Sequence, residues 1–544
     1  MLLLIYLFTN FQQIYHLIKR HAVDTILLAG LFLLAFTIYI YKVDVITPGI
    51  QGDELTIAIA SEQILSSPEF VPFVPVNLGH PTPLLYLTGL SIHTFGRTIT
   101  AIRLPYVLFG ALSIAAFFVL LRLFFDKTIA TTGSLLMLFS YPFIIVSRLA
   151  YEVSPEIFFQ ILSIIFLALA WEKKDLRYYV AIGLALGAGL YTYVGFRTFA
   201  PLILLATGYF IFKSTNITKI RIKLFCVTCA ALFIVLVPLL SYSIDHPQEI
   251  MERTASLAPL NQNYPQTEIT NELFSNVGRL PRLFFMGDPN VWENGDTNFR
   301  NNPSNVSMFD LGTFLFLLIG LFFLLRNNRK LLIIIVLLAV SPLVNDLFVI
   351  ERIPEAIHPY GVGHPNTLRI AGIIPIIYFV IIYGVNKLRL LWKDSGINLA
   401  HIAFIFLAGI MFYNWYLYYE QPADNKNFSF YITNHNGVYV LDIVNLINTS
   451  NFNEVAVSPQ VLSDGRFNYF IKKGVTVNVY DPKNYTDAIK KAQENQVTFF
   501  YALSNIQLAQ QLITQGQVQG LQIEPLTLLG NINTLYAIAF VKTP

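Results

Sequence analysis

The chain has 544 residues, of which 55% are hydrophobic, 14% aromatic and only 13% charged, and its net charge is +3. Soluble domains carry about 25% charged residues, so this composition excludes an ordinary soluble enzyme; a disordered chain is excluded by the high hydrophobicity. The small net charge, without a concentrated basic stripe, argues against a nucleic-acid partner. Two cysteines, Cys226 and Cys229, are too few for a disulfide scaffold. The sequence therefore predicts a polytopic membrane protein.

About eleven segments approach the roughly 20 apolar residues that a membrane-spanning helix needs. In chain order they are residues 25–41, 103–121, 129–147, 155–171, 178–194, 199–212, 224–242, 310–325, 331–350, 370–386 and 398–415. Residues 1–18 are apolar but interrupted by amides and a histidine, which is typical of an amphipathic helix at the membrane interface. The predicted fold class is a mainly α polytopic membrane protein with about eleven transmembrane helices.

Basic residues predict the orientation of these helices. With a cytoplasmic N-terminus, the inner segments hold ten lysines and seven arginines, whereas the outer segments up to residue 415 hold one lysine, Lys42, and ten arginines. The lysine excess follows the positive-inside rule. We therefore expect a multi-pass plasma-membrane protein whose N-terminus is cytoplasmic.

Arginine dominates the outer basic residues, and several of them stand in very short connections: Arg97, Arg103, Arg148, Arg197 and Arg369. A guanidinium pairs bidentately with a phosphate or a carboxylate. For any single arginine, anchoring at the membrane interface is the alternative interpretation. As a group, these arginines indicate a phosphate ligand at the outer leaflet.

Three outer segments are long: residues 42–102, 243–308 and 351–369. The first contains two helix-like runs, Glu54–Leu65 and Leu84–Phe95, and we expect both to lie at the outer interface. After residue 419 the composition changes, so we predict a transmembrane domain over 1–419 and a small extracytoplasmic α/β domain over 420–544. This second domain has no phosphate loop or nucleophile motif, and it could orient an acceptor or serve as a structural cap.

Within residues 420–544, strand-like and helix-like segments alternate. Strands are predicted at 454–458, 475–480, 497–502 and, as pairs, near 520–541; helices are predicted at 466–473, 485–494 and 506–514.

Asp53 and Glu54 follow the first predicted span directly. Adjacent carboxylates at a membrane boundary are costly unless used, and one of them could act as a general base. The alternative is a helix N-terminus, with Asp53 as N-cap and Glu54 in the first turn. His80 opens the second outer helix and is either a ligand of the site or satisfied structurally.

Further polar residues stand in the short outer turns. Arg148 and Glu152 join the third and fourth spans, and Tyr193 and Arg197 lie in the next outer turn. His364 and Arg369 precede the tenth span, in a segment that also holds His358 and Asn366. A histidine pair without a suitably spaced carboxylate is a weak metal signal, so metal binding stays unknown, with a divalent ion as one possibility.

Several strings of the chain, taken in order, resemble the GT-C membrane glycosyltransferases that use polyprenyl-phosphate sugars. The closest group is the protein O-mannosyltransferase-like family, which includes the bacterial aminoarabinose transferase for lipid A. The strings are GDELTIAIASEQIL, HPTPLLYL followed by AIRLP, SRLAYEVSPEIFF and LYTYVGFRTFAPLILL, with FFMGDPN and HPNTLRIAGIIP further on. The resemblance covers about residues 20–385. Thr82 replaces the second proline of the family's His-Pro-Pro-Leu string, and Glu152 stands where many members have aspartate.

The resemblance implies roles for individual residues. Asp53 would be the catalytic base, with Glu54 beside it in the acidic motif. Glu152 would be the second essential acid, orienting the acceptor or a metal. The carrier phosphate would be held by Arg148, Arg197 and Arg369.

The predicted activity is therefore sugar transfer from a dolichyl- or undecaprenyl-phosphate carrier to a protein, lipid or glycan acceptor on the outer face, as a hexosyl- or pentosyltransferase of cell-envelope glycosylation. The alternative is a transporter or flippase of a lipid-linked substrate. A transporter favours charged or broken helices at the bilayer midplane and internal repeats, neither of which is apparent. A third reading, a non-catalytic assembly protein of this fold, is disfavoured because Asp53 and Glu152 are present.

Overall fold

The computed structural model describes residues 22–214, 218–257, 266–285, 301–304, 306–348, 366–392, 399–421, 437–449, 454–479, 498–502, 522–527 and 535–541. Its contacts divide the chain into two units. The first comprises Met1–Tyr41, Val71–Leu84 and Arg103–Tyr419; the second comprises Lys42–Phe70, Leu85–Ile102 and Glu420–Pro544. Two segments that precede residue 103 thus group with the C-terminal residues, while the predicted boundary after residue 419 stays a prediction.

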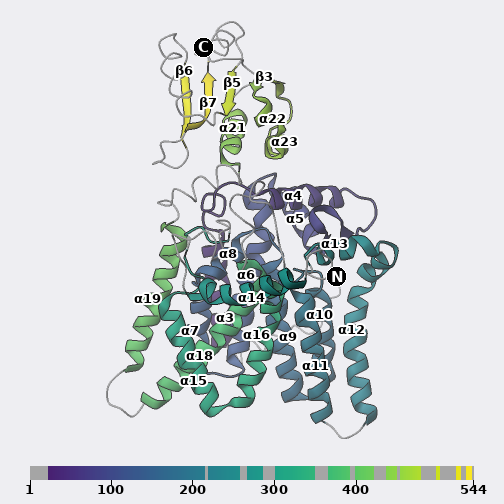
Figure 1. The fold of residues 1–544 in the computed structure, drawn as a ribbon, viewed down its shortest axis with the longest axis vertical. Coiled ribbons are helices and arrows are strands. Elements are labelled where there is room, and N and C mark those ends of the chain that lie inside the picture. The colour runs from purple at the N-terminus through teal and green to yellow at the C-terminus, as the bar shows by residue number, and fades with distance from the viewer. Residues whose placement is uncertain are drawn as a thin grey trace. The chain divides into compact units, whose positions relative to one another are not determined.

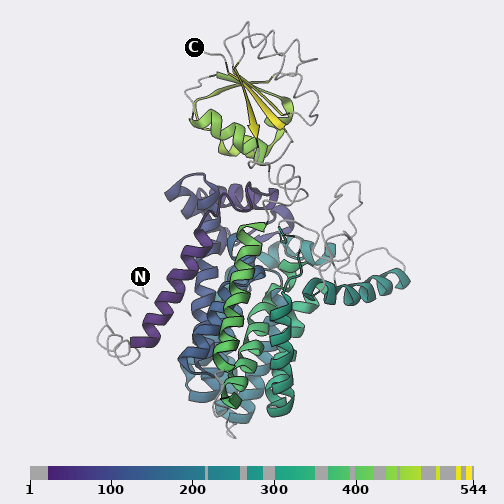
Figure 2. The ribbon, with the colours of Figure 1, turned by 90° about the vertical axis from the view of Figure 1, so that its left-hand side faces the viewer.

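Most helices of the first unit are upright and lie side by side as a bundle in Figures 1 and 2. The helices of this unit are α3 Ala22–Ile40, α6 Ile99–Arg122, α7 Lys127–Leu138, α8 Tyr141–Arg148, α9 Val153–Lys173, α10 Leu176–Gly189, α11 Phe196–Ser214, α12 Thr218–Asp245, α13 Pro247–Leu257, α14 Gln266–Phe285, α15 Leu311–Asn327, α16 Arg329–Leu347, α17 Thr367–Ile370, η3 Ala371–Ile373, α18 Ile374–Trp392 and α19 Leu399–Tyr419. In the same figures, α14 runs across the upright helices.

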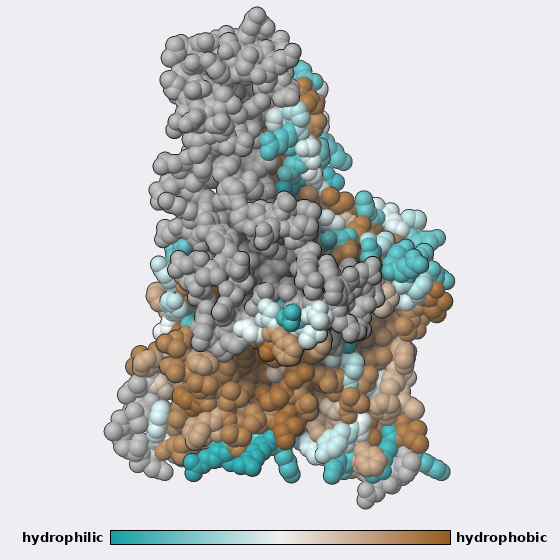
Figure 3. Space-filling model, in the orientation of Figure 1, coloured by the Kyte–Doolittle hydropathy of each residue, from teal (hydrophilic) through white to brown (hydrophobic). Residues whose placement is uncertain are grey.

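The predicted spans coincide with helices of this unit. Within the described part of the chain, seven helices are long and apolar enough to cross a membrane, and α10 and α15 are shorter apolar helices. The protein is therefore an integral membrane protein, while the exact number of eleven spans stays a prediction. Apolar side chains form a band over the bundle with a hydrophilic rim at its lower edge (Figure 3). Residues 1–18 lie outside the described residues.

One span differs from the prediction. Residues 129–147 were expected to form a single helix, but α7 and α8 meet at a 64° bend. Pro142 stands in the first turn of α8, where its missing N–H costs nothing, and this residue cannot continue a preceding helix. The bend thus ends α7 and starts α8 in a new direction.

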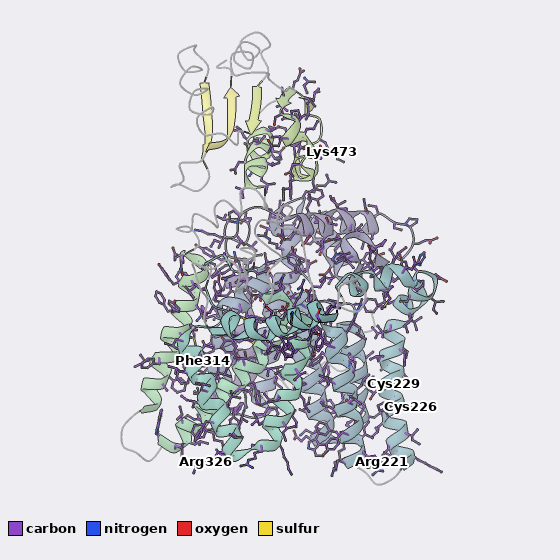
Figure 4. All side chains as sticks on the ribbon, in the orientation of Figure 1. Arg221, Cys226, Cys229, Phe314, Arg326 and Lys473 are labelled. Carbon is purple, nitrogen blue, oxygen red and sulfur yellow. The ribbon has the colours of Figure 1, made fainter. Side chains whose placement is uncertain are left out.

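Glycines bring the helices of the bundle close together. A Cβ at Gly187 of α10 would lie 2.7 Å from the Val235 Cβ of α12, and one at Gly183 would overlap the Thr228 carbonyl oxygen. Helix pairs in membranes pack closely through such small residues. On α12, the free thiols of Cys226 and Cys229 are exposed and half-buried, respectively (Figure 4).

The second unit combines helices with a mixed sheet. Its helices include α4 Gly52–Leu65, most of α5 Pro83–Phe95, α21 Val438–Thr449, α22 Pro459–Ser463 and α23 Gly465–Phe470. The strands are β3 Glu454–Val457, β4 Thr476–Val479, β5 Thr498–Ala502, β6 Gln522–Thr527 and β7 Leu535–Val541, in the order β4-β3-β5-β7-β6. Strand β3 pairs in parallel with β4 and β5, while β7 is antiparallel to β5 and β6.

These elements match the predicted runs closely. The two outer helices and the strands agree with the expected ranges to within a few residues, and the predicted helix 466–473 is the shorter α23. The predicted helices 485–494 and 506–514 lie outside the described residues. The core under β3 is apolar, with Val440, Val444 and Val455 almost fully buried.

Candidate functional site

His80 and Glu152 form a buried pair in the first unit. The short strands β1 (Phe73–Val74) and β2 (His80–Pro81) pair antiparallel, with the 3-10 turn η1 (Val76–Leu78) between them, and this ribbon carries His80. Glu152 is the N-cap residue of α9. The distance from His80 Nδ1 to Glu152 Oε1 is 2.6 Å, and the two residues are only 5% and 3% exposed.

The other ring nitrogen of His80 makes this pair chemically notable. Nε2 is buried and has no hydrogen-bond partner among the residues that the structure describes. The carboxylate orients the imidazole by accepting from Nδ1, as second-shell carboxylates commonly do for histidines. A buried polar atom without a partner costs free energy, so its presence indicates a site that is completed by a ligand or water.

Arg148 serves the structure of the bundle. Its guanidinium is fully buried at the end of α8. Nη1 donates to the carbonyl oxygens of Tyr39 and Tyr41, each at 2.7 Å, and Nε donates to the Tyr418 hydroxyl at 2.9 Å. A cation near the last carbonyls of a helix compensates their partial negative charge, so Arg148 caps α3. A carrier phosphate would have to displace these bonds, and the geometry favours the capping role.

Arg197 stands in the first turn of α11, directly after the turn that holds the buried Tyr193. Next to it, the Thr198 hydroxyl lies 2.9 Å from Ser341 Oγ and from Asn345 Oδ1, both on α16. Asn345 Nδ2 donates to the Gly195 carbonyl oxygen at 3.2 Å. These bonds fix the turn that carries Arg197 against α16.

Arg369 contacts Asp346, the residue of α16 that follows Asn345. Its Nη1 lies 3.5 Å from Asp346 Oδ1, and the two side chains are 10% and 1% exposed. Asp346 Oδ2 accepts a bond from the backbone N–H of Asn366 at 3.1 Å. A guanidinium has five N–H donors, so one carboxylate does not exhaust it. Consecutive residues of α16, Asn345 and Asp346, thus hold the segments of two of the predicted phosphate-binding arginines.

Two side chains of α9 fill the space between the same segments. Gln160 Nε2 donates to Glu156 Oε1 at 3.0 Å, and both residues are buried. A Cβ at Gly195 would lie 2.8 Å from Glu156 Oε1, and one at Gly372 would lie 2.7 Å from Gln160 Nε2. The absence of a side chain at these two glycines lets both segments approach α9 closely.

Asp53 and Glu54 lie in the second unit, in the first turn of α4. Glu54 is 1% exposed and Asp53 is half-buried. The expected N-cap role of Asp53 is wrong, because Gln51 is the N-cap residue. The Gln51 N–H donates to Glu54 Oε2 at 3.4 Å, so Glu54 contributes to the cap instead. An acidic first turn is favourable at the positive end of the helix dipole.

The remaining predicted residues are less informative. Arg103 is a buried residue of α6. His364 lies outside the described residues. In the described part of the chain, no group of three or more histidine, cysteine, aspartate and glutamate residues is placed to hold a metal ion, and metal dependence stays a prediction.

Sequence reasoning missed Asn345, Asp346, Glu156 and Gln160. The first two end a long apolar run and the last two begin one, so they read as the edges of spans. Pairs of polar residues at the ends of two apolar spans, α9 and α16, were the available signal.

A known protein family matches the part of the chain that carries several of these residues. Residues 79–242 match the family model described as dolichyl-phosphate-mannose-protein mannosyltransferase. This segment includes His80, Glu152 and Arg197 and excludes Asp53 and Arg369. No curated protein matches the chain significantly.

Two similar solved structures are those of ArnT from Cupriavidus metallidurans, one bound to undecaprenyl phosphate and one in the apo state. Each is 12% identical in sequence, and each alignment covers 94% of this chain and 97% of ArnT, with TM-scores of 0.51 and 0.52. The chain has the GT-C glycosyltransferase fold. The predicted mainly α polytopic membrane fold is therefore confirmed, and the family-model match over residues 79–242 agrees with the predicted superfamily.

Proposed function

We propose that this GT-C protein transfers a sugar from a polyprenyl-phosphate carrier to an acceptor on the outer face of the membrane. The observation that carries the proposal is the buried His80–Glu152 pair, with its incompletely bonded imidazole, inside the segment that matches the mannosyltransferase family model. A buried polar pair of this kind is costly inside an apolar bundle and is typical of a functional site.

A polyprenyl phosphate is the proposed carrier for two reasons. ArnT, which shares the fold, was solved with undecaprenyl phosphate bound. In addition, consecutive residues of α16 hold the segments of Arg197 and Arg369. Asn345 contacts Thr198 and Gly195, which flank Arg197, and Asp346 contacts Arg369 itself. Arginine is suited to a phosphate because its planar fork matches two phosphate oxygens.

The proposed reaction is a displacement at the sugar's anomeric carbon. An acceptor oxygen or nitrogen forms a bond to C1, and the bond between C1 and the phosphate oxygen breaks, releasing the polyprenyl phosphate. The acceptor's proton passes to a base, for which Asp53 is proposed from its place in the acidic motif. Arg197 and Arg369 stabilise the negative charge that develops on the departing phosphate. His80 and Glu152 are proposed to orient the acceptor.

The test uses the full chain reconstituted in liposomes with undecaprenyl-phosphate-linked hexoses and pentoses. We expect the wild type to transfer sugar and Asp53→Asn to be slower by about 100-fold or more, the usual contribution of a general base. Asp44→Asn is the matched control, because Asp44 is an exposed carboxylate of the same outer segment.

Equal rates for Asp53→Asn and the wild type would refute the base assignment. Wild-type protein that moves these lipids between leaflets without transferring sugar would refute the proposed function in favour of a flippase.

A further inference from the structure

The C-terminal segment of the second unit makes a direct bond to the chain at the start of α4. Arg466, in the first turn of α23, donates from Nε to the Ile50 carbonyl oxygen at 2.7 Å. Its Nη1 donates to Asp464 Oδ2 at 2.8 Å, and Asp464 also caps α23 by accepting from the Arg466 N–H. The Arg466 and Asp464 side chains are only 11% and 15% exposed. The carboxylate therefore holds the guanidinium in the orientation that reaches Ile50.

Two glycines leave room for this contact. Gly437 has φ +61°, and a Cβ there would lie 2.6 Å from Arg466 Nη1. A Cβ at Gly465 would touch the buried Leu55 of α4, 3.3 Å from its Cδ2 atom. The backbone of the C-terminal segment thus packs closely around Arg466 and against the second turn of α4.

Arg97 links the C-terminal half of α4 to α23. Arg97 Nε donates to Glu62 Oε1 at 3.0 Å, and its Nη1 donates to the Tyr469 carbonyl oxygen at 3.2 Å. The guanidinium also lies 4.8 Å from the centre of the Tyr469 ring. Helix α23 therefore contacts α4 near both of its ends.

We propose that residues 437–449 and 454–479 act as a clamp that fixes the first turn of α4, with Arg466 as its positioning residue. Ile50 immediately precedes Gln51, the N-cap residue of α4, and the Leu55 N–H bonds the Gln51 carbonyl oxygen at 2.9 Å. Helix ends open more readily than helix centres, so a bond to the chain that enters α4 suppresses local opening of the turn carrying Asp53 and Glu54. Its effect on catalysis rests on the proposed function; its effect on α4 does not.

The experiment is hydrogen–deuterium exchange on the full reconstituted chain, compared between wild type, Arg466→Ala and Lys473→Ala. Lys473 is an exposed cation of the same segment, labelled in Figure 4, and serves as the matched control. We expect Arg466→Ala to speed exchange of amides 54–58 about tenfold, as loss of a charge-assisted hydrogen bond implies, with amides of α3 unchanged. Lys473→Ala should exchange like the wild type.

Sugar transfer by the same variants supplies the second readout. Arg466→Ala should lower kcat about tenfold with the KM for the lipid donor unchanged, because the turn is displaced while the carrier contacts are kept. Arg466→Lys, which retains one donor, should recover part of both effects and tests the proposal if the alanine variant does not fold.

Unchanged exchange at 54–58 in Arg466→Ala would overturn the clamp. Faster exchange with unaltered kcat would overturn its catalytic consequence. Faster exchange in Arg466→Ala, together with a wild type that transfers no sugar, would support the clamp and refute the proposed function. The two failures are therefore distinguishable.

Discussion

Two buried pairs in the region of the candidate site in the first unit contrast with one exposed ion pair of the second unit. In the first unit the pairs His80–Glu152 and Arg369–Asp346 are nearly inaccessible, with side chains at most 10% exposed. In the second unit the Arg97–Glu62 pair is 45% and 30% exposed. A buried pair must be complete to be tolerated, since an unpaired charge in an apolar interior is very costly, whereas an exposed pair contributes little. The two buried pairs of the first unit therefore couple the candidate site to the fold, while the exposed Arg97–Glu62 pair of the second unit mainly sets position.

The largest effect is expected for the buried His80–Glu152 pair. Glu152→Gln preserves the shape of the side chain but removes the charge that orients His80. We expect the transfer rate to fall by about 100-fold, the size of effect that a misplaced acceptor can cause. The measurement is kcat in reconstituted membranes, with Glu172→Gln, which removes an exposed carboxylate paired with Lys173, as control. Equal losses in both variants would contradict the assignment.

A smaller effect is expected at Arg369. Asp346→Asn leaves this guanidinium buried without its carboxylate, which should lower the free energy of unfolding by about 3 kcal/mol. The KM for the lipid donor should rise, because Arg369 loses its orienting partner. Asp24→Asn is the control, since the Asp24–Arg122 pair is about one-third exposed. Denaturant unfolding and donor titrations measure the two effects, and a control that loses as much stability would argue against the role of burial.

The smallest effect is expected in the second unit. Glu62→Gln removes the charge of the partly exposed Arg97–Glu62 pair while Arg97 is kept, and it should reduce the free energy of unfolding by about 0.5 kcal/mol, an effect that high salt should abolish. Thermal unfolding at low and high salt measures it. A loss of stability as large as that of Asp346→Asn would contradict the distinction between buried and exposed ion pairs.

Local patterns predicted the elements of the fold well. Apolar length located the helices, and alternation with turn residues located the strands β3, β4 and β5. The α7–α8 bend was missed because the window from 129 to 147 is apolar throughout, although Pro142 was a visible breaker. The alternative that Asp53 is the N-cap residue rested on residue type, whereas the cap position depends on where the backbone turns.

Pairings across the chain were beyond the reach of sequence. The sequence placed Glu152 in a short turn between two spans, and only the fold shows that it contacts His80, 72 residues away. Asp346 reads as the polar edge of a span, and only the fold brings it to Arg369. Arg148 matched a family motif, yet its surroundings were decided by α19, where Tyr418 lies 270 residues away.

The close packing of α10 against α12 bears on how the chain is inserted during synthesis. With 14 residues, α10 is about 21 Å long, shorter than the roughly 30 Å hydrocarbon core. Such a segment has a weak drive to enter lipid alone, and its glycine face becomes buried only when α12 is present. The translocon therefore has to accommodate α10 before its partner emerges, which makes integration of this segment a cooperative event among neighbouring helices.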